Sequence, residues 1–310
     1  MLRRALVVWL LTLGSIPALF VVSLTSLGLY YDQEVFVDSR LPTISGCFGR
    51  NEVGIENTWS QDLCTFGSPD SQRSLLIVGD STVASMTDGL VSAAADLDME
   101  IVAYPSRGCT FTTRFPHSYK WCSDYFEKSI DLISKIRPDG IIVSNYLSRM
   151  DLPDRRIPLI SGELPQSRQQ KLESTIDSLT EALLSVRQLM PETPILIIHE
   201  IPFVPFRRPS VLFNQAAFPV VDEKSRSYLR QREYISAVER VATTFSNVSV
   251  IDPKSVLCRR SICSAKTSDG MWLYMDSYHL NPRGATLLTS QFREWILKHV
   301  PSSQSGQNGS

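Results

Sequence analysis

The chain has 310 residues, 43% of them hydrophobic and 20% charged, a composition typical of a folded globular protein rather than a disordered one. Its 31 Lys and Arg residues nearly balance its 32 Asp and Glu residues, which leaves a formal net charge of −1 at pH 7. A chain so nearly neutral has no electrostatic reason to bind nucleic acid as its main partner. With 15 glycines and 18 prolines, it is not a fibrous or low-complexity protein either.

An apolar segment without charged side chains occupies residues 5–30. As a helix it would reach roughly 39 Å, at about 1.5 Å per residue, which exceeds the ~30 Å core of a bilayer. Arg3 and Arg4 precede it and two acidic residues follow, so the positive-inside rule places the remainder outside the cytoplasm. We predict a single-pass transmembrane anchor over residues 1–31, followed by an extracytoplasmic domain that is periplasmic or at the cell surface.

A cleavable signal peptide is the alternative for this segment. Its apolar region would normally span about 7–15 residues and end at a site with small residues. The apolar segment here is longer, and bulky Leu and Tyr residues occupy positions 27 and 29–31, where cleavage would be expected. The length favours the anchor, and cleavage stays open as the alternative.

Six cysteines follow the anchor, and they fit an oxidising compartment. An even number of cysteines outside the cytoplasm is typical of disulfide bonds, and their spacing differs from the paired C-x-x-C of a zinc site. Proximity in the sequence suggests three pairs, although spacing alone does not fix the connectivity: Cys47–Cys64, Cys109–Cys122 and Cys258–Cys263.

Five short apolar runs alternate with longer helical stretches after a polar, turn-rich lead-in over residues 32–70. The expected strands are residues 74–79, 101–104, 140–143, 194–198 and 248–251. The expected helices are residues 82–97, 119–137, 169–190, 223–246 and 282–299. This alternation is typical of a parallel sheet covered on both faces. We predict an α/β domain over residues 32–300, a three-layer α/β/α sandwich with a mostly parallel five-stranded sheet, and a disordered tail over residues 301–310.

Two segments rich in Pro and Arg interrupt this alternation, residues 150–168 after the third strand and residues 202–222 after the fourth. In an open parallel sheet, ligands bind at the carboxyl ends of the strands. We therefore expect both segments to border the mouth of a site at that edge.

Ser81 follows the first expected strand directly, in the sequence Gly79-Asp80-Ser81-Thr82. A serine between a strand and a helix can present an exposed hydroxyl beside free backbone N–H groups. The alternative is an ordinary helix N-cap, a position that serine often occupies.

Near the other end of the chain, Asp276 lies three residues before His279 and just ahead of the last expected helix. A nucleophilic serine needs a base, and a histidine base needs a carboxylate to orient it. The alternatives are a surface histidine and a turn-forming aspartate. Together with Ser81, the two residues predict a Ser-His-Asp triad.

These residues resemble the SGNH (GDSL-type) hydrolase and acyltransferase superfamily. Its first sequence block is matched by Gly79-Asp80-Ser81, and its last block, Asp-x-x-His, by Asp276 and His279. The resemblance covers about residues 74–299 and implies a flavodoxin-like fold with a serine nucleophile.

The resemblance also implies an oxyanion hole. The family's second block supplies a glycine amide, for which Gly108 is the matching position, and its third block supplies an asparagine side chain, for which Asn145 is the candidate. The chain departs from the family pattern in two places: Thr82 replaces the usual Leu or His, and Asn145 lacks the usual Gly-x-Asn-Asp setting.

A narrower resemblance is to the SGNH domain attached to acyltransferase family 3 membrane proteins, which O-acylate bacterial cell-surface polysaccharides. It rests on the apolar lead-in, the pair Cys258–Cys263 and the sequence Tyr274-x-Asp276-x-x-His279-Leu280. It implies a membrane-anchored O-acyltransferase for polysaccharide or other glycans, working alone or with a separate multi-helix membrane partner. The alternatives are a carbohydrate or acetyl esterase of the same fold, and a non-catalytic glycan-binding module.

Other residues have a functional and a structural interpretation. His199 and Glu200 could reach the rim of the site, although a buried histidine bonded to backbone is the more common case. Three aromatic residues could stack on a sugar or pack beneath the loops: Trp121, Trp272 and Tyr274. Three arginines could hold an anionic glycan or form a solvated loop: Arg149, Arg155 and Arg156. The sequence has no H-E-x-x-H motif, Gly-rich phosphate loop or EF-hand loop, and we expect neither a metal nor a cofactor.

Overall fold

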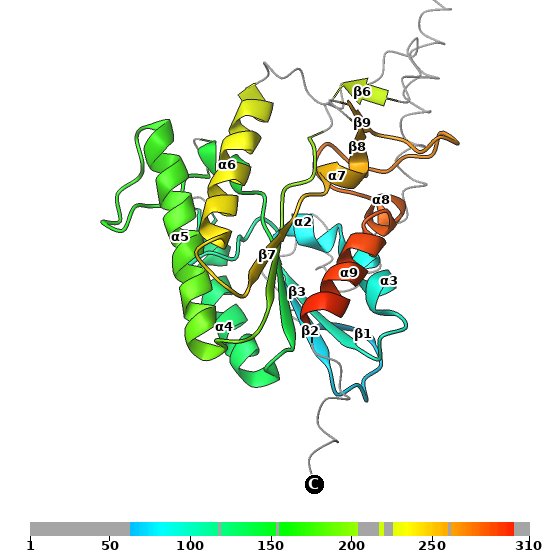
Figure 1. Cartoon of the computed structure of the whole chain (residues 1–310). Helices are drawn as coiled ribbons and strands as arrows, with labels where there is room; N and C mark the ends of the chain where they lie inside the picture. Colours follow the sequence, from blue (N-terminus) through cyan, green and yellow to red (C-terminus); the bar gives the residue numbers. More distant parts are fainter. Residues whose placement is uncertain are drawn as a thin grey trace, which may run out of the picture.

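The computed structural model describes residues 63–116, 119–152, 155–203, 217–219, 226–259 and 262–300. Through these residues runs a six-stranded sheet in the order β1-β3-β2-β4-β5-β7 (Figure 1). Its strands are β1 (Cys64–Gly67), β2 (Ser74–Gly79), β3 (Glu100–Pro105), β4 (Gly140–Ser144), β5 (Ile195–Ile198) and β7 (Val248–Ile251). The last five are parallel, whereas β1 pairs antiparallel with β3 at one edge.

The five parallel strands are the apolar runs that the sequence predicts, but the prediction of five strands in the sheet is wrong by one. Strand β1 lies in the lead-in that we expected to be polar and rich in turns. Within β1, Cys64 is buried and Phe66 half-buried, while Thr65 and Gly67 are exposed. Four alternating residues at a sheet edge form a pattern too short to distinguish from a turn.

Strand β2 explains why the central strands are continuous apolar runs. All four residues from 75 to 78 are 0% exposed, since both faces of the sheet are covered. Successive side chains point to opposite faces. Leu75 and Ile77 therefore pack into one core cluster, and Leu76 and Val78 pack into the other.

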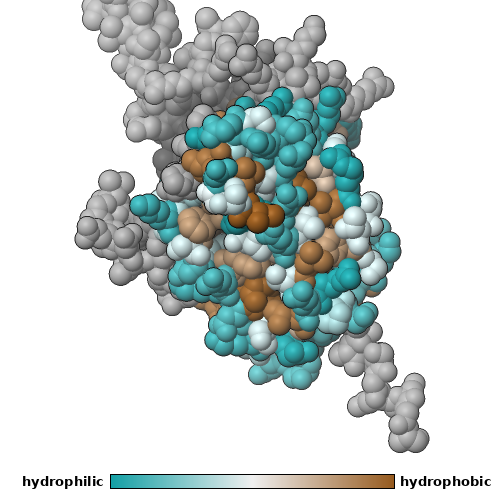
Figure 2. Space-filling view, turned by 90° about the vertical axis from the view of Figure 1, so that its left-hand side faces the viewer, coloured by the Kyte–Doolittle hydropathy of each residue, from teal (hydrophilic) through white to brown (hydrophobic). Residues whose placement is uncertain are grey.

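Helices cover both faces of the sheet (Figure 1). One face carries α3 (Thr87–Ala94), α8 (Pro282–Thr286) and α9 (Thr289–His299). The other face carries α4 (Tyr125–Ile136), α5 (Arg168–Leu189) and α6 (Arg226–Ala242). The outer surface of this second layer is mostly hydrophilic with separate apolar patches (Figure 2), and the exposed Leu184 and Leu189 belong to α5. The predicted three-layer arrangement is therefore confirmed.

Two of the predicted helices are each divided in two. The first consists of α2 (Ser81–Ala84) and α3, and the last consists of α8 and α9. The backbones of α3 and α8 lie almost in contact at Gly89. A Cβ atom at this position would collide with the carbonyl of Ala285, so the close approach requires glycine. This close approach brings the segment that follows β2 against the segment that follows His279.

A second sheet lies beyond the end of β7, in the order β6-β9-β8. Its strands are β6 (Ala217–Pro219), β8 (Cys258–Arg259) and β9 (Ile262–Ser264), and helix α7 (Lys254–Leu257) leads into it. Strand β6 falls within the segment 202–222 that we predicted to interrupt the alternation.

Across the ranges given above, no helix combines the length and the apolar character that a membrane crossing requires. The predicted anchor over residues 1–31 and the predicted tail over residues 301–310 lie outside the described residues, as do residues 32–62 of the predicted domain.

Candidate active site

Ser81 is the first residue of α2, directly after the carboxyl end of β2. The N-cap of this helix is Asp80, whose side chain accepts a hydrogen bond from the Thr82 N–H at 2.8 Å. The alternative role of Ser81 as the helix N-cap is therefore filled by its neighbour. The Ser81 side chain, which is half-buried, is left for another partner.

That partner is His279, although 198 positions separate the two residues in the sequence. The Ser81 Oγ lies 2.8 Å from the His279 Nε2, and the His279 Nδ1 lies 2.7 Å from the Asp276 Oδ2. When the Nδ1–H of His279 donates a hydrogen bond to the carboxylate, its Nε2 is left to accept one from the serine hydroxyl. The structure thus brings together the three residues that the sequence singled out.

Both oxygens of Asp276 have donors. Oδ2 faces the imidazole, while Oδ1 accepts from the backbone N–H groups of Tyr278 at 2.7 Å and His279 at 2.9 Å. Partial burial would raise the pKa of Asp276, but the hydrogen bonds and the interaction with His279 hold the pKa of this carboxyl below its ordinary value. The group is therefore a carboxylate at neutral pH.

Asp80 joins two strand ends beneath the site. Besides capping α2, it accepts from the Tyr146 N–H through Oδ2 at 2.8 Å, and its own N–H donates to the Ser144 carbonyl at 3.2 Å. Burial raises the pKa of Asp80, although the bonds from Tyr146 and Thr82 lower it. We predicted no role for Asp80 from the sequence, although the preference of aspartate for helix N-caps was a signal that could have indicated it.

Tyr125 is a second residue that the sequence analysis missed. Its buried hydroxyl accepts from the Gly79 N–H at 2.7 Å and lies 2.9 Å from the carbonyls of Gly79 and Tyr104. Gly79 has φ +134°, and a Cβ there would collide with the Ser144 carbonyl, so that only glycine fits. The tyrosine fixes this turn, but no local motif marks a contact between residues 46 positions apart.

Gly108 lies in the turn after β3, the strand next to β2 in the sheet. Its φ of +73° is in the left-handed region, and a Cβ there would lie 2.9 Å from the ring of Tyr119. Among the described residues, none accepts a hydrogen bond from the Gly108 N–H. The turn is tied to the strand before Ser81, because the Ser106 N–H donates to the Gly79 carbonyl at 2.9 Å.

Asn145 lies after β4, on the opposite side of β2. It is buried, and its Oδ1 accepts from the Phe111 N–H at 2.8 Å. A Cβ built on Gly79 would lie 3.2 Å from the same Oδ1, which places the Asn145 side chain against the strand end before Ser81. Since the oxygen is occupied, the NH₂ end of the amide is the end that remains for a ligand.

The cysteines are paired where the structure describes them. Disulfide bonds join Cys109 to Cys122 and Cys258 to Cys263, as the sequence spacing suggested. Cys64 is also disulfide-bonded. Its expected partner, Cys47, lies outside the described residues. The first of these bonds begins one residue after Gly108, so it restricts the same turn.

The interrupting segments border the site at the ends that are described. Arg155 lies over the ring of Tyr119 at 5.1 Å, beside Gly108. Phe203 packs on Tyr278 with ring centroids 5.0 Å apart, next to His279.

The three aromatic residues proposed from the sequence differ in their environments. Trp121 is 48% exposed and stacks on Tyr119 with ring centroids 4.6 Å apart. Trp272 is half-buried beneath Lys266, and Tyr274 is buried in the core. Of the three, Trp121 alone presents a large exposed surface.

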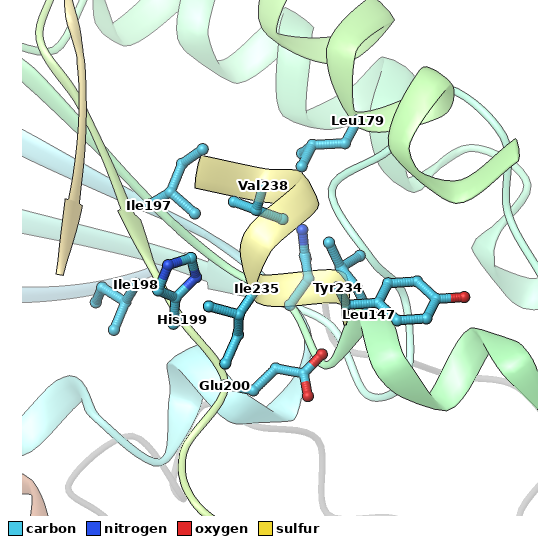
Figure 3. Close-up of a pocket in the computed structure, with 10 residues that line it drawn as sticks. Leu147, Leu179, Ile197, Ile198, His199, Glu200, Tyr234, Ile235 and Val238 are labelled. Carbon is cyan, nitrogen blue, oxygen red and sulfur yellow. The ribbon is translucent and has the colours of Figure 1, made fainter. Parts of the chain in front are cut away.

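His199 and Glu200 are buried rather than exposed on the rim of the site. Both are buried at the end of β5 and line a small cavity with Asn145 and residues of α6 (Figure 3). Glu200 accepts from the N–H and the Oγ of Ser148 at 2.5 and 2.6 Å. Burial raises the pKa of Glu200 to about 7, and burial lowers the pKa of His199. The His199 Nε2 lies 3.6 Å from Glu239 rather than on a backbone carbonyl.

Within the described ranges, no cluster of three or more His, Cys, Asp or Glu side chains could hold a metal ion. At the carboxyl edge of the sheet, the arrangement offers a serine as nucleophile, a histidine as base and a carboxylate that orients the histidine.

The family model of the SGNH domain fused to AT3 domains matches residues 46–294. The chain belongs to this family. The resemblance drawn from the sequence is therefore confirmed, and the domain is an enzyme of acyl transfer, an acyltransferase or an ester hydrolase. No relative matches among curated proteins.

Comparison with solved structures finds similar proteins. The periplasmic domain of a lipopolysaccharide acetyltransferase from Salmonella ser. Paratyphi A is 15% identical, with a TM-score of 0.53 over 73% of this chain and 84% of that chain. An acetylxylan esterase from Geobacillus stearothermophilus is 16% identical, with a TM-score of 0.43 over 73% of this chain and 94% of that chain.

Proposed function

We propose that the chain is a membrane-anchored, extracytoplasmic serine O-acyltransferase acting on cell-surface polysaccharide or another glycan. The observation that carries the proposal is the hydrogen-bonded series from Ser81 through His279 to Asp276. In this assignment Ser81 is the nucleophile, His279 is the general base and then the general acid, and Asp276 orients His279.

The first half-reaction loads the serine. The Ser81 Oγ attacks the carbonyl carbon of the acyl donor while its proton passes to the His279 Nε2. The Asp276 carboxylate stabilises the imidazolium that forms. When the tetrahedral intermediate collapses, His279 protonates the departing alcohol oxygen, and the acyl group remains as an ester on Ser81.

The second half-reaction returns the enzyme to its starting state. A glycan hydroxyl gives its proton to the His279 Nε2 and attacks the acyl-serine carbonyl. Collapse of the second intermediate breaks the bond to Ser81, and the imidazolium returns the proton to the Ser81 Oγ. The product is the O-acylated glycan.

The negative oxygen of each intermediate needs hydrogen-bond donors. We assign this role to the backbone N–H groups of Ser81 and Gly108 and to the NH₂ group of Asn145. The assignment is supported by the Gly108 N–H, which has no acceptor among the described residues, and by the Asn145 Oδ1, which is occupied by Phe111. One such donor can contribute about 3 kcal/mol to lowering the barrier.

Location and partner rest on separate observations. The two described disulfide bonds are typical of an oxidising compartment, and the similar Salmonella domain is periplasmic. The apolar residues 5–30 would provide the anchor, and residues 32–300 the catalytic domain. Because the family is one of SGNH domains fused to AT3 domains, we expect a multi-helix acyltransferase membrane protein as the partner that supplies acyl groups.

The second candidate is an esterase in which water replaces the glycan hydroxyl. It is favoured by the access of solvent to the site, since the side chain of Asp276 is 49% exposed. A non-catalytic glycan-binding module would have no need of a 2.8 Å contact between a serine hydroxyl and an imidazole.

Two measurements test the proposal. Wild-type protein should release 4-nitrophenol from 4-nitrophenyl acetate, and a fluorophosphonate probe should label Ser81. The Ser81→Ala protein should do neither, whereas the Ser106→Ala protein, which changes a nearby serine that bonds to no histidine among the described residues, should be labelled normally. Labelling that survives in Ser81→Ala would refute the assignment. Transfer is then separated from hydrolysis by adding acceptor sugars and measuring acetylated sugar against free acetate.

A further inference from the structure

Three aromatic side chains from three separate segments meet beside the catalytic residues. Tyr146 follows β4, Phe203 follows β5, and Tyr278 belongs to the loop before α8. The Tyr278 ring centroid lies 5.1 Å from that of Tyr146 and 5.0 Å from that of Phe203. All three residues are half-buried, so part of the cluster is accessible to solvent.

Arg149 completes this cluster. It lies in the short 3-10 helix η3 (Leu147–Asp151), and its guanidinium carbon is 4.8 Å from the Tyr278 ring centroid and 5.5 Å from that of Tyr146. A cation over aromatic faces is held by the ring quadrupoles without being neutralised by them. The charge is therefore fixed in place and stays available.

No described residue forms a hydrogen bond or an ion pair with the guanidinium of Arg149, and its nitrogens are not among the buried unpaired atoms of that part of the chain. The acid on the same helix, Asp151, lies within 4.0 Å of three other cations: Arg168, Lys171 and Arg230. Asp151 is thus engaged by other cations, and the N–H groups of the Arg149 guanidinium remain available to a ligand.

The cluster is connected directly to the proposed catalytic residues. Tyr278 is adjacent in sequence to His279, whose ring contacts the Ser81 Oγ. The Tyr146 N–H is held by the carboxylate of Asp80, the residue before Ser81. A substrate whose acyl ester lies at Ser81 would therefore place a neighbouring part of the molecule against Tyr278 and Arg149.

We propose that Arg149 and Tyr278 form a subsite for the carboxylate of an acidic sugar. The glycan that receives the acyl group from Ser81 then contains hexuronic acid or a similar carboxylated residue. This inference rests on the proposed function. The guanidinium fork matches a carboxylate in a bidentate arrangement, and one guanidinium balances its single charge. The aromatic rings offer a surface for the apolar face of the sugar ring.

The test uses a matched pair of sugars, a monoacetylated methyl glucuronoside and the corresponding monoacetylated methyl glucoside, which differ in the C6 carboxylate. Wild-type protein should have a kcat/KM at least about tenfold higher for the glucuronoside, since a charge-assisted hydrogen bond is worth that factor or more. Arg149→Ala and Arg149→Gln should reduce this ratio to near one, and Arg149→Lys should retain part of it. Two neutral replacements of Arg149 are used, so that if one variant fails to fold, the other still tests the subsite.

Arg187→Ala is the control, because Arg187 also lies over an aromatic ring, that of Phe245 at 5.7 Å, but near the end of α5 rather than at the site. This variant should keep the wild-type ratio. The inference is overturned by a wild-type ratio near one, or by a ratio that Arg149→Ala and Arg149→Gln leave unchanged.

Binding separates this inference from the proposed function. The unacetylated methyl glucuronoside and methyl glucoside are titrated calorimetrically into wild-type and Arg149→Gln protein. If neither acetylated sugar is turned over, the proposed function fails, and tighter binding of the glucuronoside that is lost in Arg149→Gln still supports the subsite. Equal binding of the two sugars by wild-type protein refutes the subsite.

Discussion

The carboxylate of Asp80 accepts a hydrogen bond from the backbone N–H of Tyr146 at 2.8 Å, and this contact joins the end of β2 to the end of β4. The other oxygen of the same carboxylate caps the helix that begins with Ser81. One buried side chain therefore sets the position of the proposed nucleophile relative to the loop that carries Asn145. A serine hydrolase site depends on such distances to within a fraction of an ångström.

We expect Asp80→Asn to lower both stability and activity. An asparagine amide has one oxygen, so it can accept from Thr82 or from Tyr146, and its NH₂ group would face the other N–H. The loss should be about 1–3 kcal/mol in the free energy of unfolding, measured with urea. The kcat for 4-nitrophenyl acetate should fall in the folded protein, because Ser81 and Asn145 lose their common support.

Asp131→Asn is the control for this prediction, since Asp131 pairs with Lys135 on the exposed surface of α4. An exposed pair of this kind contributes little, so stability and kcat should stay near the wild-type values. A stable, fully active Asp80→Asn protein would show that the contact with Tyr146 does not position the site.

Ser81→Ala should remove activity without a comparable loss of stability. Because Asp80 provides the N-cap, the serine hydroxyl is not needed for the helix, and the melting temperature should stay close to that of the wild type. The rate should fall by several orders of magnitude. His279→Ala should cause a similar loss, and the double variant should be little worse, since the residues of a triad act as a unit. Additive losses in the double variant would contradict this assignment.

The sequence predicted the central strands because their burial on both faces requires uninterrupted apolar residues. It also placed Ser81 at the carboxyl edge of the sheet, since Ser81 directly follows a parallel strand, whereas His279 was paired with it through the Asp-x-x-His pattern and the family resemblance. The inferences about the strands and Ser81 depend on rules that hold along the backbone, and they need no knowledge of side-chain packing. Together with that pattern, the same rules indicate which residues belong to the site, but they do not give the distances between their side chains.

The features that the sequence did not predict depend on contacts between distant segments. Tyr125 reaches Gly79 from a helix on one face of the sheet, and the close approach of Gly89 to Ala285 arises only when α3 and α8 pack together. In the sequence around them, neither Tyr125 nor Gly89 differs from an ordinary residue of a helix. The subsite at Arg149 likewise exists because Tyr278 folds onto the end of another strand.

The raised pKa of Glu200 predicts that the stability of the protein depends on pH. Burial raises its pKa to about 7 in the folded protein, above its ordinary value of 4.5. At low pH the group is protonated in both the folded and the unfolded state and carries no penalty. As the pH rises from about 4.5 through about 7, the unfolded state loses its proton first, and the folded state loses stability relative to it.

Glu200→Gln should remove this dependence while keeping the contacts with Ser148, since an amide can accept from the Ser148 N–H and donate to its Oγ. Between pH 4.5 and pH 8, the free energy of unfolding of the variant should rise relative to that of the wild type by an amount on the order of 3 kcal/mol, measured by urea unfolding. Glu192→Gln, a change at an exposed position, should follow the wild-type curve. Parallel curves for Glu200→Gln and wild type would rule out a titrating Glu200.

The disulfide beside Gly108 should matter more than the one near β8, for stability and for catalysis. Cys109 and Cys122 are 13 residues apart, whereas Cys258 and Cys263 are 5 apart, and a longer closed loop restricts the unfolded chain more. Replacing both cysteines of a pair by alanine should cost about 3 kcal/mol for the first pair and about 2 kcal/mol for the second. Because the first bond also restricts the turn that presents the Gly108 N–H, its loss should lower kcat for 4-nitrophenyl acetate in the folded protein, measured well below the melting temperature. The second pair provides the matched control, and an equal fall of kcat in both variants would mean that the disulfide does not act through the Gly108 turn.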